Sequence, residues 1–121
     1  MEIPAQAIKT LMEIGVAGTN SGLFKQALTI FEGIDAVRPH SGEASVGVAV
    51  VHICRNEAEE AVKALREEAL VKNPKSIEAK MLLGIALKMA GRNAECDSVI
   101  KELIASGDAK AIATAESLKA R

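Results

Sequence analysis

The segment SVGVAVVHIC, residues 45–54, is apolar on every side of any regular structure it could form. It holds seven apolar residues and one histidine, and valine, isoleucine or alanine stands where a helix or strand normally turns polar. Valine and isoleucine favour strands, and a short apolar run cannot be assigned by its periodicity alone. The fold therefore depends on what surrounds this segment and on what its second apolar side contacts.

The segment belongs to a pattern that recurs first after 34 and then after 35 residues. Small residues recur at this spacing at Gly15, Ala49 and Gly84. Turn residues, further small residues and large apolar residues recur in the same register. These sets are Gly22, Asn56 and Gly91; Ala27, Ala61 and Cys96; and Phe31, Leu65 and Ile100. Pro39 and Pro74 close the first two units, with Asp108 near the third equivalent place. The second unit has one extra residue between Ala61 and Ala69.

Each unit is predicted to form a helix, a tight turn, a second helix and a link. The expected helices span residues 4–18, 23–37, 43–54, 57–72, 76–90, 93–106 and 109–120. Helix is favoured over strand for residues 45–54, because the register makes them the first helix of the second unit and no other strand candidate could pair with them.

Single residues in each unit have predicted roles. The small residue in the first helix lets the second helix approach, where Ala27, Ala61 or Cys96 meets it. Glycine at positions 22 and 91 can take the left-handed conformation that ends a helix. Asn56 is predicted to cap the next helix with Glu59 as its capping-box partner. Proline at positions 39 and 74 ends the second helix.

Over residues 8–108 this pattern resembles the tetratricopeptide repeat, although the aromatic residues common in its first helix are missing. The resemblance implies an all-α fold of three helix pairs in a right-handed solenoid, within one domain spanning residues 1–121. The final segment, 109–120, is predicted to cap the third pair through one apolar face. That face comprises Ala111, Ile112, Ala115 and Leu118.

In such a stack the first helix of each pair has a second face, which lines a concave groove. This arrangement would explain residues 45–54, and a groove so apolar is typical of a surface that binds a partner helix. Two alternatives stay open: a tightly curled solenoid that buries these residues, and pairing of two copies. The predicted partner-binding residues are Met12, Val16, Val46, Val50, Ile53, Met81, Ile85 and Met89, with Lys9, Asn20, Glu78 and Lys88 at the margins.

Composition argues against several classes of function. A net charge of −1 without a basic cluster argues against nucleic-acid binding, as do only two phenylalanines and no other aromatic residue. No secretory signal is visible at the amino end, and the longest apolar run is far shorter than the ~20 residues that span a bilayer. We expect a soluble, cytoplasmic protein without membrane contact.

Cys54 and Cys96 are expected to be reduced, buried thiols, and a disulfide between them stays open as an alternative.

No arrangement of residues predicts catalysis, and we expect no enzyme, no metal and no cofactor. The glutamates of segment 57–72 alternate with lysine and arginine, which is typical of a solvated helix face. His40 and His52 have no second metal ligand nearby in the sequence. Gly15 and Gly18 form a GxxG pattern inside the repeat, where a structural role is favoured over RNA binding.

Some tetratricopeptide proteins bind the terminal carboxylate of Hsp70 or Hsp90 through lysines and asparagines. The matching positions here are Met12, Val16, Gly47, Glu78 and Leu82. None of them is lysine or asparagine, so that function does not carry over.

In length, degenerate repeats and the segment FEGIDAVRP (31–39), the chain resembles the needle-subunit chaperones of bacterial type III secretion, the YscG type and its HrpB-like relatives. This resemblance implies a chaperone that holds the amphipathic helix of a needle subunit, and a second small helical chaperone as a further partner. A general scaffold and a self-associating repeat protein are the alternatives.

Overall fold

The computed structural model describes residues 3–119, and every regular element in that range is a helix. Residues 45–54 lie in a helix, so the strand alternative is excluded. Residue 120, which the sequence places in the last helix, lies outside the described range. The elements are α1 (Ala5–Asn20), α2 (Phe24–Val37), α3 (Glu43–Cys54), α4 (Ala58–Ala64), the π-helix η1 (Leu65–Ala69), α5 (Leu70–Lys72), α6 (Ile77–Met89), α7 (Asn93–Ala105) and α8 (Ala109–Lys119).

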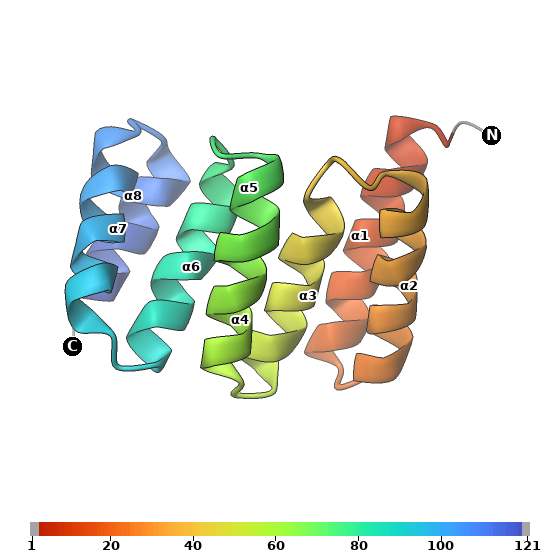
Figure 1. The fold of residues 1–121 in the computed structure, drawn as a ribbon, viewed down its shortest axis with the longest axis horizontal. Helices are drawn as coiled ribbons and strands as arrows, with labels where there is room; N and C mark the ends of the chain where they lie inside the picture. The colour runs from red at the N-terminus through yellow and green to blue at the C-terminus, as the bar shows by residue number, and fades with distance from the viewer. Residues whose placement is uncertain (1–2, 120–121) are drawn as a thin grey trace.

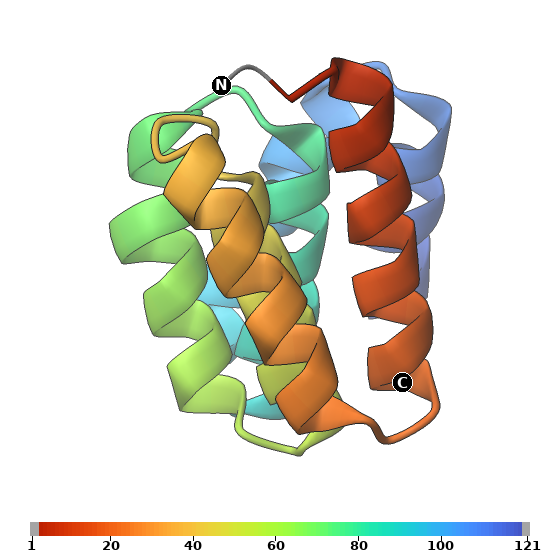
Figure 2. The same ribbon diagram turned by 90° about the vertical axis from the view of Figure 1, so that its right-hand side faces the viewer.

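The helices follow one another in a row along the longest axis of the molecule (Figure 1). Consecutive helices pack against each other, and α1 also contacts α3, α3 contacts α6, and α6 contacts α8. Figure 2 looks along this row from the α1–α2 end and shows these two helices side by side in front of the later ones. The first helices of successive pairs, α1, α3 and α6, are therefore neighbours in space although they are far apart in the sequence.

The three turns inside the pairs have the same backbone conformation. Gly22, Asn56 and Gly91 have φ angles of 82°, 61° and 74°, so all three are left-handed. The predicted capping role of Asn56 is wrong: Glu57 stands at the N-cap of α4 without a side-chain cap, and Glu59 pairs with Arg92 at 2.9 Å. Asparagine tolerates the left-handed region better than most residues, so it takes the place that glycine has in the other two turns.

The links between pairs end the second helices as predicted. Arg38 and Asn73, which precede the two prolines, both have φ near −139° and positive ψ, outside the helical region. A proline clashes with a helical residue before it, and this clash accounts for both helix ends. At the third equivalent place Gly107 is left-handed, and the Asp108 carboxylate accepts a hydrogen bond of 2.9 Å from the amide of Ala111, which caps α8.

The small residues of the first helices make room for large side chains. The closest atoms to a Cβ built on Gly15 are in the ring of Phe31, from 2.5 Å, and the same ring lies 2.5 Å from a Cβ built on Gly47. Phe31, which is fully buried, therefore fits between α1 and α3 and joins the first two pairs. The side chain nearest to Gly15 comes from Phe31, one turn after the predicted Ala27 in α2. At the third pair the predicted contact of Cys96 with Gly84 is present, with Sγ 3.5 Å from the Gly84 carbonyl oxygen.

Helix α3 is apolar all round because it contributes to two cores and to an open surface. Ala44 and Val51 belong to the core cluster around α1 and α2, whereas Val46 and Ala49 belong to the larger cluster of the later helices. Val50 remains half-buried on a third side. The composition of residues 45–54 is thus explained by the central position of α3 in the row.

The extra residue of the second unit is accommodated by η1. This π-helix covers residues 65–69, within the interval where the sequence has its insertion, and α4, η1 and α5 continue without a break. A π turn takes up one more residue than an α turn, so Leu65 and Ala69, four positions apart, take the buried places that belong to residues three positions apart in the other units. The equivalent pairs in α2 and α7, Phe31 with Ile34 and Ile100 with Leu103, are three apart.

The last helix covers the end of the row. Ala111, Ala115 and Leu118 are buried against α6 and α7, and Ile112 is half-buried. A Cβ on Gly84 would lie 2.7 Å from Leu118, so this glycine makes room for the capping helix. The packing predicted for the segment after Asp108 is confirmed for the residues that the structure describes.

Candidate functional site

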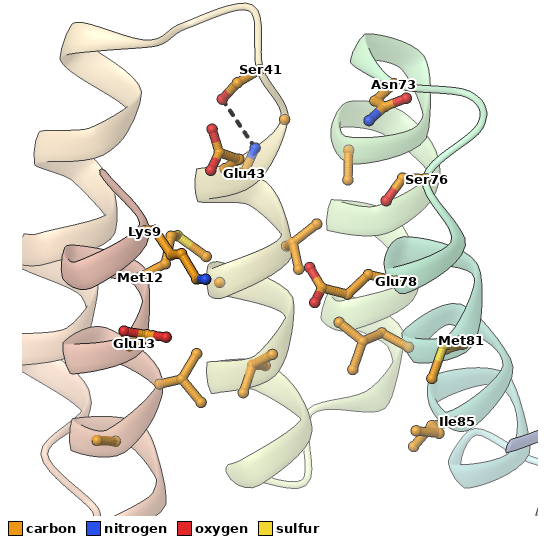
Figure 3. Close-up of a pocket in the computed structure, with 18 of the residues that line it drawn as sticks. Lys9, Met12, Glu13, Ser41, Glu43, Asn73, Ser76, Glu78, Met81 and Ile85 are labelled. Carbon is orange, nitrogen blue, oxygen red and sulfur yellow. Dashed lines mark hydrogen bonds between the residues drawn. The ribbon is translucent and has the colours of Figure 1, made fainter. Parts of the chain in front are cut away.

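A pocket of about 780 Å³ lies across α1, α3 and α6 (Figure 3). The links that precede α3 and α6 and the end of η1 complete its wall. The lining residues are Lys9, Met12, Glu13, Val16, Ala17, Asn20, Ser41, Gly42, Glu43, Val46, Gly47, Val50, Ala69, Asn73, Ser76, Glu78, Met81, Leu82 and Ile85. We call this surface the groove.

Six of the eight predicted partner-binding residues line the groove, and two do not. Ile53 is half-buried and packs against the larger core cluster. Met89 is 41% exposed and lies at the last position of α6, beyond the lining residues. The partner-binding role of the residues that do line the groove stays a prediction. They are Met12, Val16, Val46, Val50, Met81 and Ile85.

The lining follows the repeat register, so residues at equivalent positions form rows across the three helices. The first apolar row comprises Met12, Val46 and Met81, and the second apolar row comprises Val16, Val50 and Ile85. A third row, the charged row, comprises Lys9, Glu43 and Glu78. On each helix the members of the two apolar rows are four residues apart, about one helical turn, so the rows lie next to each other as a continuous strip of the groove.

The charged row and the links make one end of the groove polar. Ser41 and Ser76 line this end, and their hydroxyls accept hydrogen bonds from the amides of Glu43 (3.2 Å) and Ala79 (3.1 Å). Figure 3 shows Lys9 reaching from α1 toward α3 and Glu78 reaching from α6 toward α3. One lysine and three glutamates are the charged residues of the lining, so the groove has a net charge of −2.

Glu43 lines the groove although it is not among the residues predicted from the sequence. Lys9 and Glu78 are predicted at the margins of the groove, and Glu43 lies 34 residues after the first and 35 before the second. The same spacing that identified the apolar positions was thus sufficient to find it. Glu13 also shares the spacing, because it stands 34 residues before Gly47 and Gly47 stands 35 before Leu82, and all three line the groove. Ser41, Asn73 and Ser76 enter the groove through the paths of the links.

The two histidines do not lie in the groove. His52 Nδ1 lies 2.8 Å from a carboxylate oxygen of Glu57, at the turn between α3 and α4. The hydrogen bond with His52, together with the charge of Arg55, lowers the pKa of the Glu57 carboxyl. His40 is exposed in the link before α3. Within residues 3–119, no group of three or more histidine, cysteine, aspartate or glutamate side chains is placed to hold a metal ion.

Both cysteines are free thiols, but they differ in exposure. Cys96 is buried as predicted; its Sγ lies 3.5 Å from the carbonyl oxygen of Gly84, and burial raises the pKa of the thiol. The prediction that Cys54 is buried is wrong. It is the last residue of α3, in register with Asn20 and Met89, and all three positions are exposed because the helices end there.

None of the helices described between residues 3 and 119 combines the length and the apolar character needed to cross a membrane.

A family model described as a bacterial type III secretion protein (HrpB1_HrpK) matches residues 1–121. The chain belongs to the HrpB1_HrpK family of bacterial type III secretion proteins. A search of curated proteins finds no match, and a search of solved structures finds none either. The predicted association with type III secretion is therefore confirmed for this HrpB1_HrpK protein, whereas its chaperone role stays a prediction.

Proposed function

We propose that this HrpB1_HrpK protein is a chaperone of its secretion system. Its groove binds an apolar amphipathic helix of a needle subunit and covers that helix in the cytosol, which prevents premature polymerisation. The role is one of binding, without catalysis, metal or cofactor. A second small helical chaperone is a further expected partner.

The observation that carries this proposal is the pair of adjacent apolar rows across α1, α3 and α6. An amphipathic helix presents apolar side chains at i, i+3, i+4 and i+7, which form a stripe of matching character. Methionine in the first apolar row adds flexible side chains that adapt to an inserted surface. Membership of a family of bacterial type III secretion proteins is consistent with a partner from the same system.

The proposed architecture is that of tetratricopeptide helix pairs in one domain. It is supported by the 34- and 35-residue spacing, and by the similar surroundings of equivalent residues. Gly15, Ala49 and Gly84 are all buried, as are Ala27, Ala61 and Cys96. The left-handed turns at Gly22, Asn56 and Gly91 follow the same register.

The proposal is tested by co-expressing the protein with the needle subunit of the same secretion system and measuring capture by pull-down. Val50→Asp places a carboxylate in the second apolar row, against the apolar face of the bound helix. We expect capture to be lost while the circular dichroism spectrum stays helical. Val71→Asp is the matched control, because Val71 is 67% exposed on α5 and does not line the groove. Equal capture by the wild type and by Val50→Asp would overturn the proposal.

A second candidate, self-association, is favoured by a separate feature of α1. Leu11 and Ile14 are 38% and 51% exposed, do not line the groove, and lie on the first helix of the row. The other end of the row is covered by α8, whereas within the described residues no helix covers this side of α1. Sedimentation of the isolated protein tests this candidate: a dimer that Ile14→Asp dissociates supports it, and a monomeric wild type excludes it.

A further inference from the structure

The charged row of the groove carries an inference that rests on the proposed function and concerns what the bound helix must contain. Lys9, Glu43 and Glu78 stand at one register position in three successive pairs, so they lie along one side of the two apolar rows. A helix whose apolar stripe covers those rows therefore has one flank against the charged row. The charges of the groove residues in this row therefore determine which side chains suit that flank of the bound helix.

The acidic charge is concentrated on the α3–α6 side of the groove. Near α1, Lys9 and Glu13 have opposite charges and stand one helical turn apart. Glu43 and Glu78 have no basic lining residue on their own helices, and Figure 3 shows the Glu78 side chain directed into the groove. Across residues 3–119, none of the three groove glutamates forms an ion pair.

The positions of Glu43 and Glu78 are partly explained by a stabilising role within the protein itself. Glu43 and Glu78 lie in the first turns of α3 and α6, where a carboxylate interacts favourably with the helix dipole. A bound helix would nevertheless remove water from both carboxylates, and an acidic flank would bring like charges together. A basic flank would supply the missing partners, and complementary charge at an interface selects among ligands.

We propose that the occupant of the groove is an amphipathic helix with lysine or arginine beside its apolar stripe, on the flank that meets Glu43 and Glu78. The apolar rows supply most of the binding. The two carboxylates set which flank of the helix faces the polar end of the groove, and they disfavour helices with an acidic flank. Ion pairs that stay partly solvated at the edge of an interface contribute up to about fivefold in affinity each.

The test is a selection of displayed helical peptides of about 20 residues on the isolated protein. In the peptide library, the positions of the apolar stripe vary among apolar residues, and the positions on both flanks of the stripe vary among lysine, arginine, glutamine and glutamate. The best peptide is then synthesised with its basic flank residues intact, replaced by glutamine, or replaced by glutamate. Binding is measured by fluorescence anisotropy with wild-type protein, Val50→Asp, and the double variant Glu43→Gln/Glu78→Gln, after thermal melting has established that both variants are folded.

We expect lysine or arginine to be enriched on one flank, and replacement by glutamine to weaken binding to the wild type by about threefold to tenfold. The double variant should reduce this difference to less than about twofold, and added salt should reduce it in the wild type by screening. Selected peptides with an apolar stripe but no basic flank would overturn this inference and leave the proposed function standing. Failure to select any peptide that depends on Val50 would overturn both.

Discussion

Phe31 is the side chain on which the packing of the first two pairs depends most directly. It is fully buried, and its ring occupies the space left by the absent side chains of Gly15 and Gly47 on two different helices. Any side chain at either glycine must move the ring, and a ring fixed by two helices cannot move without shifting their backbones. The stability of the first pair and its attachment to α3 therefore depend on the same contact.

Gly47→Ala is expected to lower the free energy of unfolding by about 1–3 kcal/mol, because the new methyl group would lie 2.5 Å from the Phe31 ring. Gly33→Ala is the matched control, since Gly33 lies in α2 with no atom within 4 Å of the place that a methyl group would take. That variant should gain up to about 1 kcal/mol from the higher helix propensity of alanine. Urea denaturation of both variants measures the difference, and equal stabilities would contradict the packing of Phe31 against α3.

At the scale of elements, the π-helix keeps the second pair in register with the others. Its backbone lies directly against the start of α3: a Cβ on the left-handed Gly42 would stand 3.2 Å from the carbonyl oxygen of Ala69. The Ser45 hydroxyl also donates a hydrogen bond of 3.4 Å to Glu68. Because Ala69 and Gly42 both line the groove, the local widening of this helix shapes the polar end of the candidate site.

Deletion of Glu67 is expected to convert η1 to ordinary α-helix and to change the stability by no more than about 1 kcal/mol. Glu67 is exposed, and its removal would bring Leu65 and Ala69 to the spacing found in α2 and α7. The control is deletion of Lys101, also exposed, in α7, which has no π turn. That deletion rotates the buried Leu103 by about 100° and should cost about 2–5 kcal/mol. Thermal and urea unfolding compare the two, and equal losses would contradict the role of the insertion.

At the scale of the whole molecule, ion pairs connect the second helices of successive pairs. Lys72 lies 3.5 Å from Asp35, Arg66 lies 2.6 Å from Glu95, and Arg92 lies 2.9 Å from Glu59. Glu95 has two basic partners, because Arg92, the N-cap residue of α7, also lies 2.6 Å from it. Hydrogen bonds from Arg92 and then Arg66 lower the pKa of the Glu95 carboxyl from its usual value of 4.5.

The lowered pKa makes the contribution of Glu95 dependent on pH. A carboxyl with a lower pKa in the folded protein adds stability above its unfolded pKa, and this stability is lost as the pH falls through the folded value. Glu95→Gln should therefore be less stable than the wild type at pH 7, and the difference should shrink as the pH falls below 4.5. Urea denaturation across this range measures the effect, with Glu67→Gln as the control because Glu67 forms no ion pair among residues 3–119. A difference that does not change with pH would contradict the network.

The sequence by itself determined the features that are local or periodic. Helix content, the repeat spacing, the glycine turns at 22 and 91, and the proline links depend on backbone preferences that act within a few residues. The same periodicity found six groove residues, since residues at equivalent positions of stacked pairs must face the same side. It also contained the charged row, because Glu43 shares the register of Lys9 and Glu78.

Only the tertiary structure decided which side chains meet. The Phe31 ring fills the space beside Gly15 and Gly47, Cys54 is exposed at a helix end, Ile53 packs half-buried against the core, and Asn56 takes a left-handed conformation instead of capping a helix. Each of these outcomes depends on how a helix is rotated about its axis and where it ends against its neighbours. A single residue more or less in a turn changes that rotation by about 100°, and only the packing of all the helices together determines it.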